Sequence, residues 1–160
     1  MNQNYILYKS PIGTMKITEE DGKIIELYLL QNDVYMSEKC VQHTVLQYEA
    51  CKQLDEYFSG KRKNFSLPIK YRGTEFQKKV WHELQNIPYG KTVSYEDIAI
   101  RVGNKKAIRA IGQANNKNPI MLVIPCHRVI NKNGTIGGFG CGIGVKEYLL
   151  NLEKRNNINM

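Results

Sequence analysis

The segment Ser94–Ala114, SYEDIAIRVGNKKAIRAIGQA, decides the fold class of the second half of this chain. Ser94 is a favourable N-cap for a short helix, and Gly103-Asn104 provides a turn after it. A second short helix is expected over 105–114. Two short helices joined by a glycine-containing turn predict a helix-turn-helix unit, although an ordinary helical hairpin would give the same pattern.

The charge distribution separates the two halves of the chain. The formal net charge is +8, and residues 75–160 hold thirteen Lys and Arg against six Asp and Glu, whereas residues 1–74 hold ten against nine. A basic half beside a nearly neutral one suggests a polyanionic partner for the basic half. A basic surface kept for solubility would give the same numbers. Together with the helix pair, the charge favours nucleic acid.

The second helix of the pair has an unusual composition for a helix that reads bases in a major groove. Its cations are Lys105, Lys106 and Arg109. Its small residues are Ala110, Gly112 and Ala114. Small residues allow close approach of the backbone, so the helix is expected to bind a narrow groove and to insert its one Arg. The alternative is that the small residues pack under a neighbouring helix, which suits the two alanines better than the glycine.

The first half predicts an α/β domain. Strands are expected over 5–8, 15–18 and 24–30. Asp21-Gly22 is a hairpin signal between the second and third strands, and apolar residues recur at helical spacing over 46–58. Residues 31–43 are polar and are expected to form a loop.

The boundary between the halves is placed at Gly73. Pro68–Gly73 is interpreted as a linker, which gives an N-terminal α/β domain over 1–73 and a mainly helical domain over 74–160. Thr74 followed by Gln77 fits a capping box at the start of a helix.

Overall composition is that of an ordinary globular protein, with 42% hydrophobic and 24% charged residues. The sequence has no apolar run near eighteen residues and no secretory signal at its start, so no membrane association is expected. Four scattered cysteines are too few for a disulfide scaffold, which indicates a reducing compartment: the cytoplasm, or the nucleus of a eukaryote.

The chemistry-bearing segment follows Asn118-Pro119. The apolar run 120–124 predicts a buried strand that ends at Pro125, and a thiol and an imidazole come next, at Cys126 and His127. An unperturbed thiol is only about 3% ionised at pH 7, so a nucleophilic role needs a neighbouring base or cation. His127 and Arg128 are the local candidates. The alternative is that Cys126 is a small buried core residue.

Several separated motifs, in register, strongly resemble the O6-alkylguanine-DNA alkyltransferase family. The central one is Ile124–Ile130, IPCHRVI, which resembles the active-site signature of that family. Further motifs agree in order and spacing: Ile87–Tyr95, Arg109–Gly112, Asn118-Pro119, Gly134–Gly138 and Lys146–Glu153. The resemblance covers about residues 74–153. Residues 1–73 fit only in layout, which implies a ribonuclease H-like α/β domain ahead of a winged-helix, helix-turn-helix domain.

The resemblance implies a role for each matching residue. Cys126 is the alkyl acceptor, His127 its base through a water, and Glu153 orients the histidine. Asn118 braces the active-site turn, and Tyr95 donates a hydrogen bond to the departing guanine. The expected pocket residues are Val123, Gly138, Phe139 and Lys146. Arg109 fills the space of the extruded nucleotide. The other expected DNA contacts are Ser94, Lys105, Lys106, Ala110, Gly112 and Arg128.

The implied activity is a single irreversible transfer of an alkyl group from O6-alkylguanine in double-stranded DNA, with O4-alkylthymine as a further substrate to test. No metal is expected, because Cys40, His43 and Cys51 fit no zinc spacing. A single displacement by a thiol needs no cofactor, and a monomer is expected. The chain departs from the family at Phe139, where a tyrosine is usual, and at Cys141, expected to be inert. The rivals are a non-catalytic lesion-binding protein, a transcription regulator and a thiol hydrolase.

Overall fold

A computed structural model describes residues 3–31, 43–138, 140 and 142–158 of the chain. The chain divides into two compact units, Met1–Tyr71 and Arg72–Met160, each with its own core. Of the loop predicted over 31–43, only residues 31 and 43 are described. Cys40, Phe139 and Cys141 lie outside the described residues. None of the helices in the described part of the chain has the length and apolar character needed to span a bilayer.

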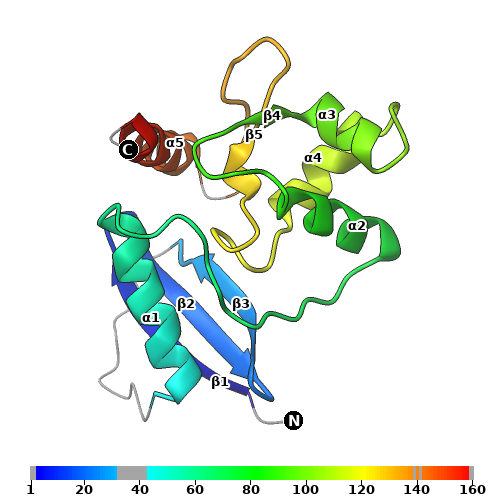
Figure 1. Ribbon diagram of the computed structural model, residues 1–160. Helices are drawn as coiled ribbons and strands as arrows, with labels where there is room; N and C mark the ends of the chain where they lie inside the picture. The colour runs from blue at the N-terminus through cyan, green and yellow to red at the C-terminus, as the bar shows by residue number, and fades with distance from the viewer. Residues whose placement is uncertain (1–2, 32–42, 139, 141, 159–160) are drawn as a thin grey trace. The chain divides into compact units, whose positions relative to one another are not determined.

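The first unit is an antiparallel sheet with one helix against it (Figure 1). The strands β1 (Gln3–Ser10), β2 (Gly13–Glu20) and β3 (Lys23–Leu29) pair in that order. Alternation along the strands puts the apolar side chains on one face, where α1 (Val45–Phe58) buries them. The core residues of this unit are Ile6, Met15, Ile17, Ile24, Leu27, Ala50, Leu54 and Tyr57. The α/β prediction for this half is confirmed.

The turn between β2 and β3 is the hairpin turn that the sequence predicts. Asp21 and Gly22 have φ values of +50° and +79°, and two consecutive positive values are the requirement of a type I′ turn. Asp tolerates this region better than most residues, and Gly adopts it without steric cost.

The predicted linker is shorter than the sequence suggested. Ile24 pairs with Ile69 as a parallel bridge, in which the Ile24 amide donates to the Pro68 carbonyl at 2.8 Å and the Lys70 amide donates to the Ile24 carbonyl at 3.0 Å. Residues 68–70 therefore extend the sheet of the first unit. Proline was read as a linker signal, but a proline can sit at a sheet edge, where its missing N–H costs no ladder hydrogen bond.

The second unit is mainly helical, as predicted. Its elements are α2 (Glu75–Leu84), β4 (Val93–Ser94), α3 (Tyr95–Arg101), α4 (Ile108–Asn116), the 3₁₀ turn η1 (Cys126–Arg128), β5 (Val129–Ile130) and α5 (Ile143–Ile158). Helices α3 and α4 pack against each other and against α2 (Figure 1), which gives the helix-turn-helix arrangement. Helix α4 starts at Ile108, later than expected, because residues 105–107 form a turn in which the Ala107 amide donates to the Asn104 carbonyl.

The buried strand predicted over 120–124 is wrong. These residues form a compact turn: Met121 bridges to Ile124, and the Ile124 amide donates to the Ile120 carbonyl at 2.9 Å. Leu122 has a φ of +73°, which no extended strand contains. The apolar run correctly indicated burial, but burial alone does not distinguish a strand from a buried turn.

The capping box of α2 gives a stability prediction. The Thr74 hydroxyl accepts from the Gln77 amide at 3.1 Å, and the Gln77 side chain accepts from the Thr74 amide at 2.9 Å. Thr74→Ala should lower the free energy of unfolding by about 1 kcal/mol, because α2 loses this cap. Urea unfolding would measure the change, with Lys79→Ala on the same helix as the control. Equal stability of the two variants would contradict the importance of the cap.

Candidate active site

The thiol and the imidazole lie in one buried 3₁₀ turn. Cys126, His127 and Arg128 are 4%, 1% and 6% exposed. Pro125 precedes the turn, and the Arg128 amide donates to its carbonyl at 3.0 Å. Neighbouring side chains of an extended strand point to opposite faces, and this turn removes that constraint.

Two asparagines hold the backbone around the thiol. The Asn118 side chain donates to the Ile124 carbonyl at 2.6 Å and accepts from the Ile120 amide at 3.0 Å, which fixes the turn ahead of Cys126. Asn115, which is 1% exposed at the end of α4, donates to the Cys126 carbonyl at 3.2 Å. The sequence analysis missed Asn115, because an Asn in a polar helix carries no signal that its side chain is buried.

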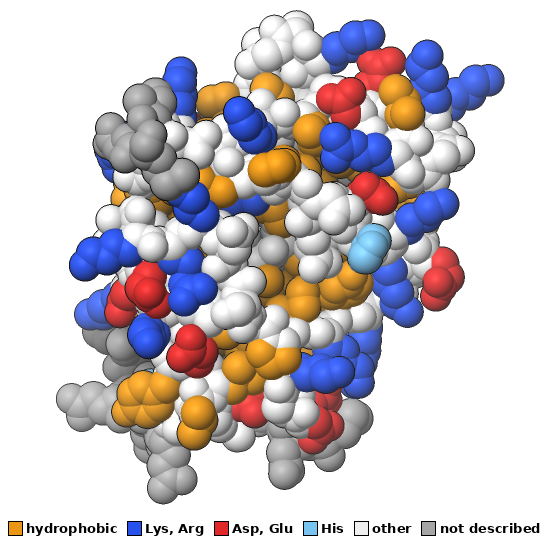
Figure 2. All heavy atoms as spheres, viewed as in Figure 1, with side chains coloured by type: hydrophobic (Ala, Val, Ile, Leu, Met, Phe, Trp, Pro, Cys, Tyr) orange, Lys and Arg blue, Asp and Glu red, His pale blue; other side chains and the backbone are white. Residues whose placement is uncertain are grey.

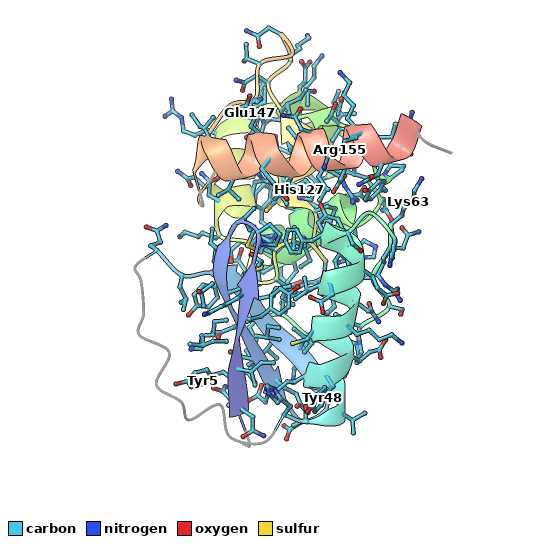
Figure 3. The ribbon with its side chains drawn as sticks, turned by 90° about the vertical axis from the view of Figure 1, so that its left-hand side faces the viewer. Tyr5, Tyr48, Lys63, His127, Glu147 and Arg155 are labelled. Carbon is cyan, nitrogen blue, oxygen red and sulfur yellow. The ribbon has the colours of Figure 1, made fainter. Side chains whose placement is uncertain are left out.

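His127 lies beside α5 (Figure 3), the helix that carries Glu153. The His127 Nε2 lies 2.5 Å from Glu153 Oε2, and both side chains are 1% exposed. Since an ionised carboxylate only accepts, Nε2 carries a proton and Nδ1 of the neutral ring has a lone pair. Within the described residues, the buried Nδ1 has no hydrogen-bond partner. The ring is therefore held in the tautomer that can act as a base through Nδ1.

Glu153 is ionised in the folded protein. Burial alone would raise its pKa, but the hydrogen bonds and charges of His127 and Arg128 outweigh burial and hold the pKa well below its usual range. The Gly90 amide adds a further hydrogen bond to Oε1 at 3.1 Å. Gly90 was not singled out from the sequence as a partner of Glu153. Its φ of +76° and its contact with Asn157, which an added Cβ would meet at 2.6 Å, explain the glycine.

Arg128 was expected to contact DNA, and this prediction is wrong. Its guanidinium is buried, with Nε 2.8 Å and Nη2 3.1 Å from the Glu153 oxygens and with Nη1 2.7 Å from the Ile87 carbonyl. Each guanidinium nitrogen thus contacts the protein, and a side chain that is 6% exposed is not presented to a phosphate. The sequence indicated a cation in a basic half, and only the fold turns it inward.

Tyr95 and Lys146 form one hydrogen-bonded group with two backbone carbonyls. Lys146 is fully buried, and its ammonium donates to the Val129 carbonyl at 2.6 Å and to the Gly138 carbonyl at 3.3 Å. The Tyr95 hydroxyl lies 3.5 Å from that ammonium and 3.4 Å from the Gly138 carbonyl.

Burial shifts the pKa values of this pair in opposite directions. It lowers the pKa of Lys146 to about 8, and the charge of Cys126 acts against that shift. It raises the pKa of Tyr95, and the charge of Cys126 adds to that rise. Val123, the other described candidate for the pocket, is half-buried.

The outward side of α4 carries the residues expected to meet nucleic acid. Lys105, Lys106, Arg109 and Ala110 are exposed, and Lys and Arg side chains are spread over the face shown in Figure 2. A Cβ added at Gly112 would meet nothing within 4 Å, so no neighbouring helix requires this glycine. The packing alternative holds for Ala114, which is buried, and is wrong for Ala110. Ser94 caps α3, its hydroxyl accepting from the Asp97 amide.

Among the described residues, no three His, Cys, Asp or Glu side chains come together as a set of metal ligands. Cys51 is half-buried on α1 of the first unit.

Both units match models of the same protein family. The model described as 6-O-methylguanine DNA methyltransferase, ribonuclease-like domain, matches residues 4–71, and the model for the DNA binding domain of the same family matches residues 75–155.

Curated relatives match over nearly the whole chain. A constitutive methylated-DNA–protein-cysteine methyltransferase of Bacillus subtilis is 46% identical, over 94% of this chain and 94% of its own. A methylated-DNA–protein-cysteine methyltransferase of Methanosarcina acetivorans is 42% identical, over 93% and 97%.

The fold also matches solved structures. The O6-methylguanine methyltransferase of Mycobacterium tuberculosis has a TM-score of 0.85 and 38% identity, over 97% of this chain and 94% of its own. The Mycobacterium tuberculosis OGT in complex with DNA has the same TM-score and identity, over 95% and 93%.

The buried ammonium of Lys146 gives a pH prediction. In the folded protein it should lose its proton near pH 8 instead of at its ordinary 10.5. Between these values the unfolded chain binds more protons, so this group makes the free energy of unfolding rise with pH in that window. NMR of ¹³C-labelled lysines should show one amine titrating near pH 8, absent in Lys146→Met and retained in Lys154→Met. A Lys146 amine that stays protonated at pH 10 would contradict the burial argument.

Proposed function

This chain belongs to the O6-methylguanine DNA methyltransferase family, and we propose that it repairs O6-alkylguanine in double-stranded DNA by taking the alkyl group onto Cys126. It is a methylated-DNA–protein-cysteine methyltransferase, and DNA is its partner. The observation that carries the assignment of Cys126 is its place in one turn with His127, whose Nε2 is bound by Glu153 and whose Nδ1 is left to accept a proton.

The transfer is one displacement at carbon. The Cys126 sulfur forms a bond to the alkyl carbon as the bond from that carbon to O6 breaks, and the electron pair of the broken bond stays on the guanine. The thiol proton passes through a water to His127 Nδ1, and over the whole reaction a proton is delivered to the guanine ring. The products are unmodified guanine and a thioether.

Two further residues, Tyr95 and Lys146, assist the departure of the guanine and the ionisation of the thiol. In this proposal Tyr95 donates a hydrogen bond to the departing guanine, since burial raises the pKa of its hydroxyl and keeps it protonated. The Lys146 ammonium stabilises the developing thiolate, because opposite charges attract more strongly in a buried site. We assign contacts with the edge of the guanine to the Val123 and Gly138 backbone.

DNA meets the protein at α4. Ala110 and Gly112 let the helix backbone approach a minor groove, while Lys105, Lys106 and Ser94 contact phosphates. Arg109 enters the base stack and holds the space of the extruded nucleotide, as chemistry on a base inside a duplex requires.

The reaction ends after one turnover. A thioether is neutral and a poor leaving group, so each molecule accepts one alkyl group. The chain acts as a monomer without a metal or cofactor, and O4-alkylthymine is a second substrate to assay. A cytoplasmic location suits the chemistry, because a reducing compartment keeps the Cys126 thiol free.

The decisive experiment follows the alkyl group. Duplex DNA with a radiolabelled methyl on O6 of one guanine should transfer its label to the protein at a ratio of one to one. The peptide containing Cys126 should gain the mass of one CH₂ group, Cys126→Ala should take up no label, and Cys51→Ala should behave like wild type. Label on the Cys126→Ala protein would overturn the assignment. A wild-type protein that binds the lesion but takes up no label would favour a non-catalytic lesion-binding protein.

The open space at Gly112 gives a DNA-binding prediction. Gly112→Leu should leave the free energy of unfolding equal or higher, since a Cβ added at this position meets nothing within 4 Å and Leu has the better helix propensity. Its affinity for duplex DNA should fall about tenfold or more, because the side chain blocks close approach of α4. Fluorescence anisotropy with labelled duplex would measure it, with Gly144→Leu on α5 as the control. Unchanged affinity would remove α4 from the interface.

A further inference from the structure

We propose that Arg128 is a positioning residue for the transfer: it neutralises and orients Glu153, so that His127 stays an uncharged base. The inference rests on the function proposed above. Arg128 binds both oxygens of Glu153 side-on, with Nε at 2.8 Å from Oε1 and Nη2 at 3.1 Å from Oε2. This two-point geometry fixes the plane of the carboxylate, which a single ammonium would not do.

The charge of Glu153 must be balanced, because the carboxylate is 1% exposed. Two neighbours could supply the positive charge: the guanidinium of Arg128, which is permanently charged, and the imidazole of His127, which would have to take up a proton. With Arg128 in place, the buried pair is already neutral. The imidazole then needs no proton, and its Nδ1 lone pair remains available for the thiol proton.

The other groups around His127 act in the same direction. Burial lowers the pKa of His127, the charge of Glu153 opposes this, and the charges of Arg128 and of Lys146 lower it further. Glu153 and Lys146 come from α5, and Arg128 from η1 itself. Helix α2 also packs against η1, and its buried side chains are the uncharged Val80, Trp81 and Leu84.

Arg128 also ties the carboxylate to the segment between α2 and β4. Its Nη1 donates to the Ile87 carbonyl at 2.7 Å, and its guanidinium lies 5.6 Å from the centre of the Tyr89 ring. The Gly90 amide of the same segment donates to Glu153 Oε1 at 3.1 Å. Glu153 is thus held from η1, from segment 87–90 and from its own helix, so its Oε2 stays aimed at His127.

The test compares Arg128→Gln, Arg128→Lys and the control Arg155→Gln, which removes an exposed charge from α5. Single-turnover methyl transfer from a duplex containing one O6-methylguanine is measured from pH 5.5 to 9, and the titration of His127 is followed by ¹⁵N NMR without DNA. Arg128→Gln should slow transfer about tenfold or more at pH 6.5. It should also move the acidic limb of the pH–rate profile and the pKa of His127 upward by about one pH unit. Arg128→Lys should keep the wild-type limb, because it retains the charge, and lose only a few-fold in rate.

A folded Arg128→Gln protein with the wild-type acidic limb and His127 titration would overturn the proposal, since a merely structural Arg128 would change only the folded fraction. If Arg128→Gln does not fold, the same measurements on Arg128→Lys and on the wild type test the proposal. A wild-type His127 that is protonated at pH 7, or an Arg128→Lys limb shifted as far as expected for Gln, would then overturn it. Failure of the proposed function is a separate result, because wild type would transfer no methyl group while the NMR titration still reports on Arg128.

Discussion

The second unit depends on the hydrogen bonds that the buried Glu153 carboxylate accepts. It receives hydrogen bonds from His127, from Arg128 and from the Gly90 amide, so helix α5, the turn η1 and the segment before β4 meet at one charged group. An ionised carboxylate that is 1% exposed is stable only when its partners are fixed. The hydrogen bonds that hold these elements together also orient the imidazole beside the acceptor thiol. The same contacts therefore serve both the packing and the chemistry.

The site combines the buried Cys126 with two buried positive charges. Lys146 is fully buried and hydrogen-bonded to backbone carbonyls, and Arg128 is paired with Glu153, so each cation has partners. Their fields still act on Cys126 and His127, because charges in a buried site are weakly screened. The thiol can therefore be activated without an exposed cysteine that would react with other electrophiles. Helix α4 is connected to this site through Asn115, which donates to the Cys126 carbonyl.

Sequence reasoning succeeded where a local pattern has one physical meaning. The capping boxes at Thr74 and Ser94 and the Asp21-Gly22 turn could be read from neighbouring residues alone, because a cap or a tight turn is made within a few residues. It was wrong where the pattern has two meanings. The run 120–124 is apolar because it is buried, which a turn satisfies as well as a strand, and Arg128 is charged, which serves a buried pair as well as a phosphate contact.

By itself, the sequence determined the two-unit organisation, the helix-turn-helix, the basic half and the family, because these depend on periodicity, charge and motifs at fixed spacing. The family resemblance paired Glu153 with His127, and only the tertiary structure decided that Arg128 and Gly90 also meet this carboxylate. Glu153 lies 26 residues from His127, and Gly90 lies 63 residues from Glu153, and no local rule links such positions. Their contact follows from the packing of α5 against η1. The fold therefore turned a thiol and an imidazole that are neighbours in sequence into a site with a fixed base, a fixed carboxylate and a buried arginine.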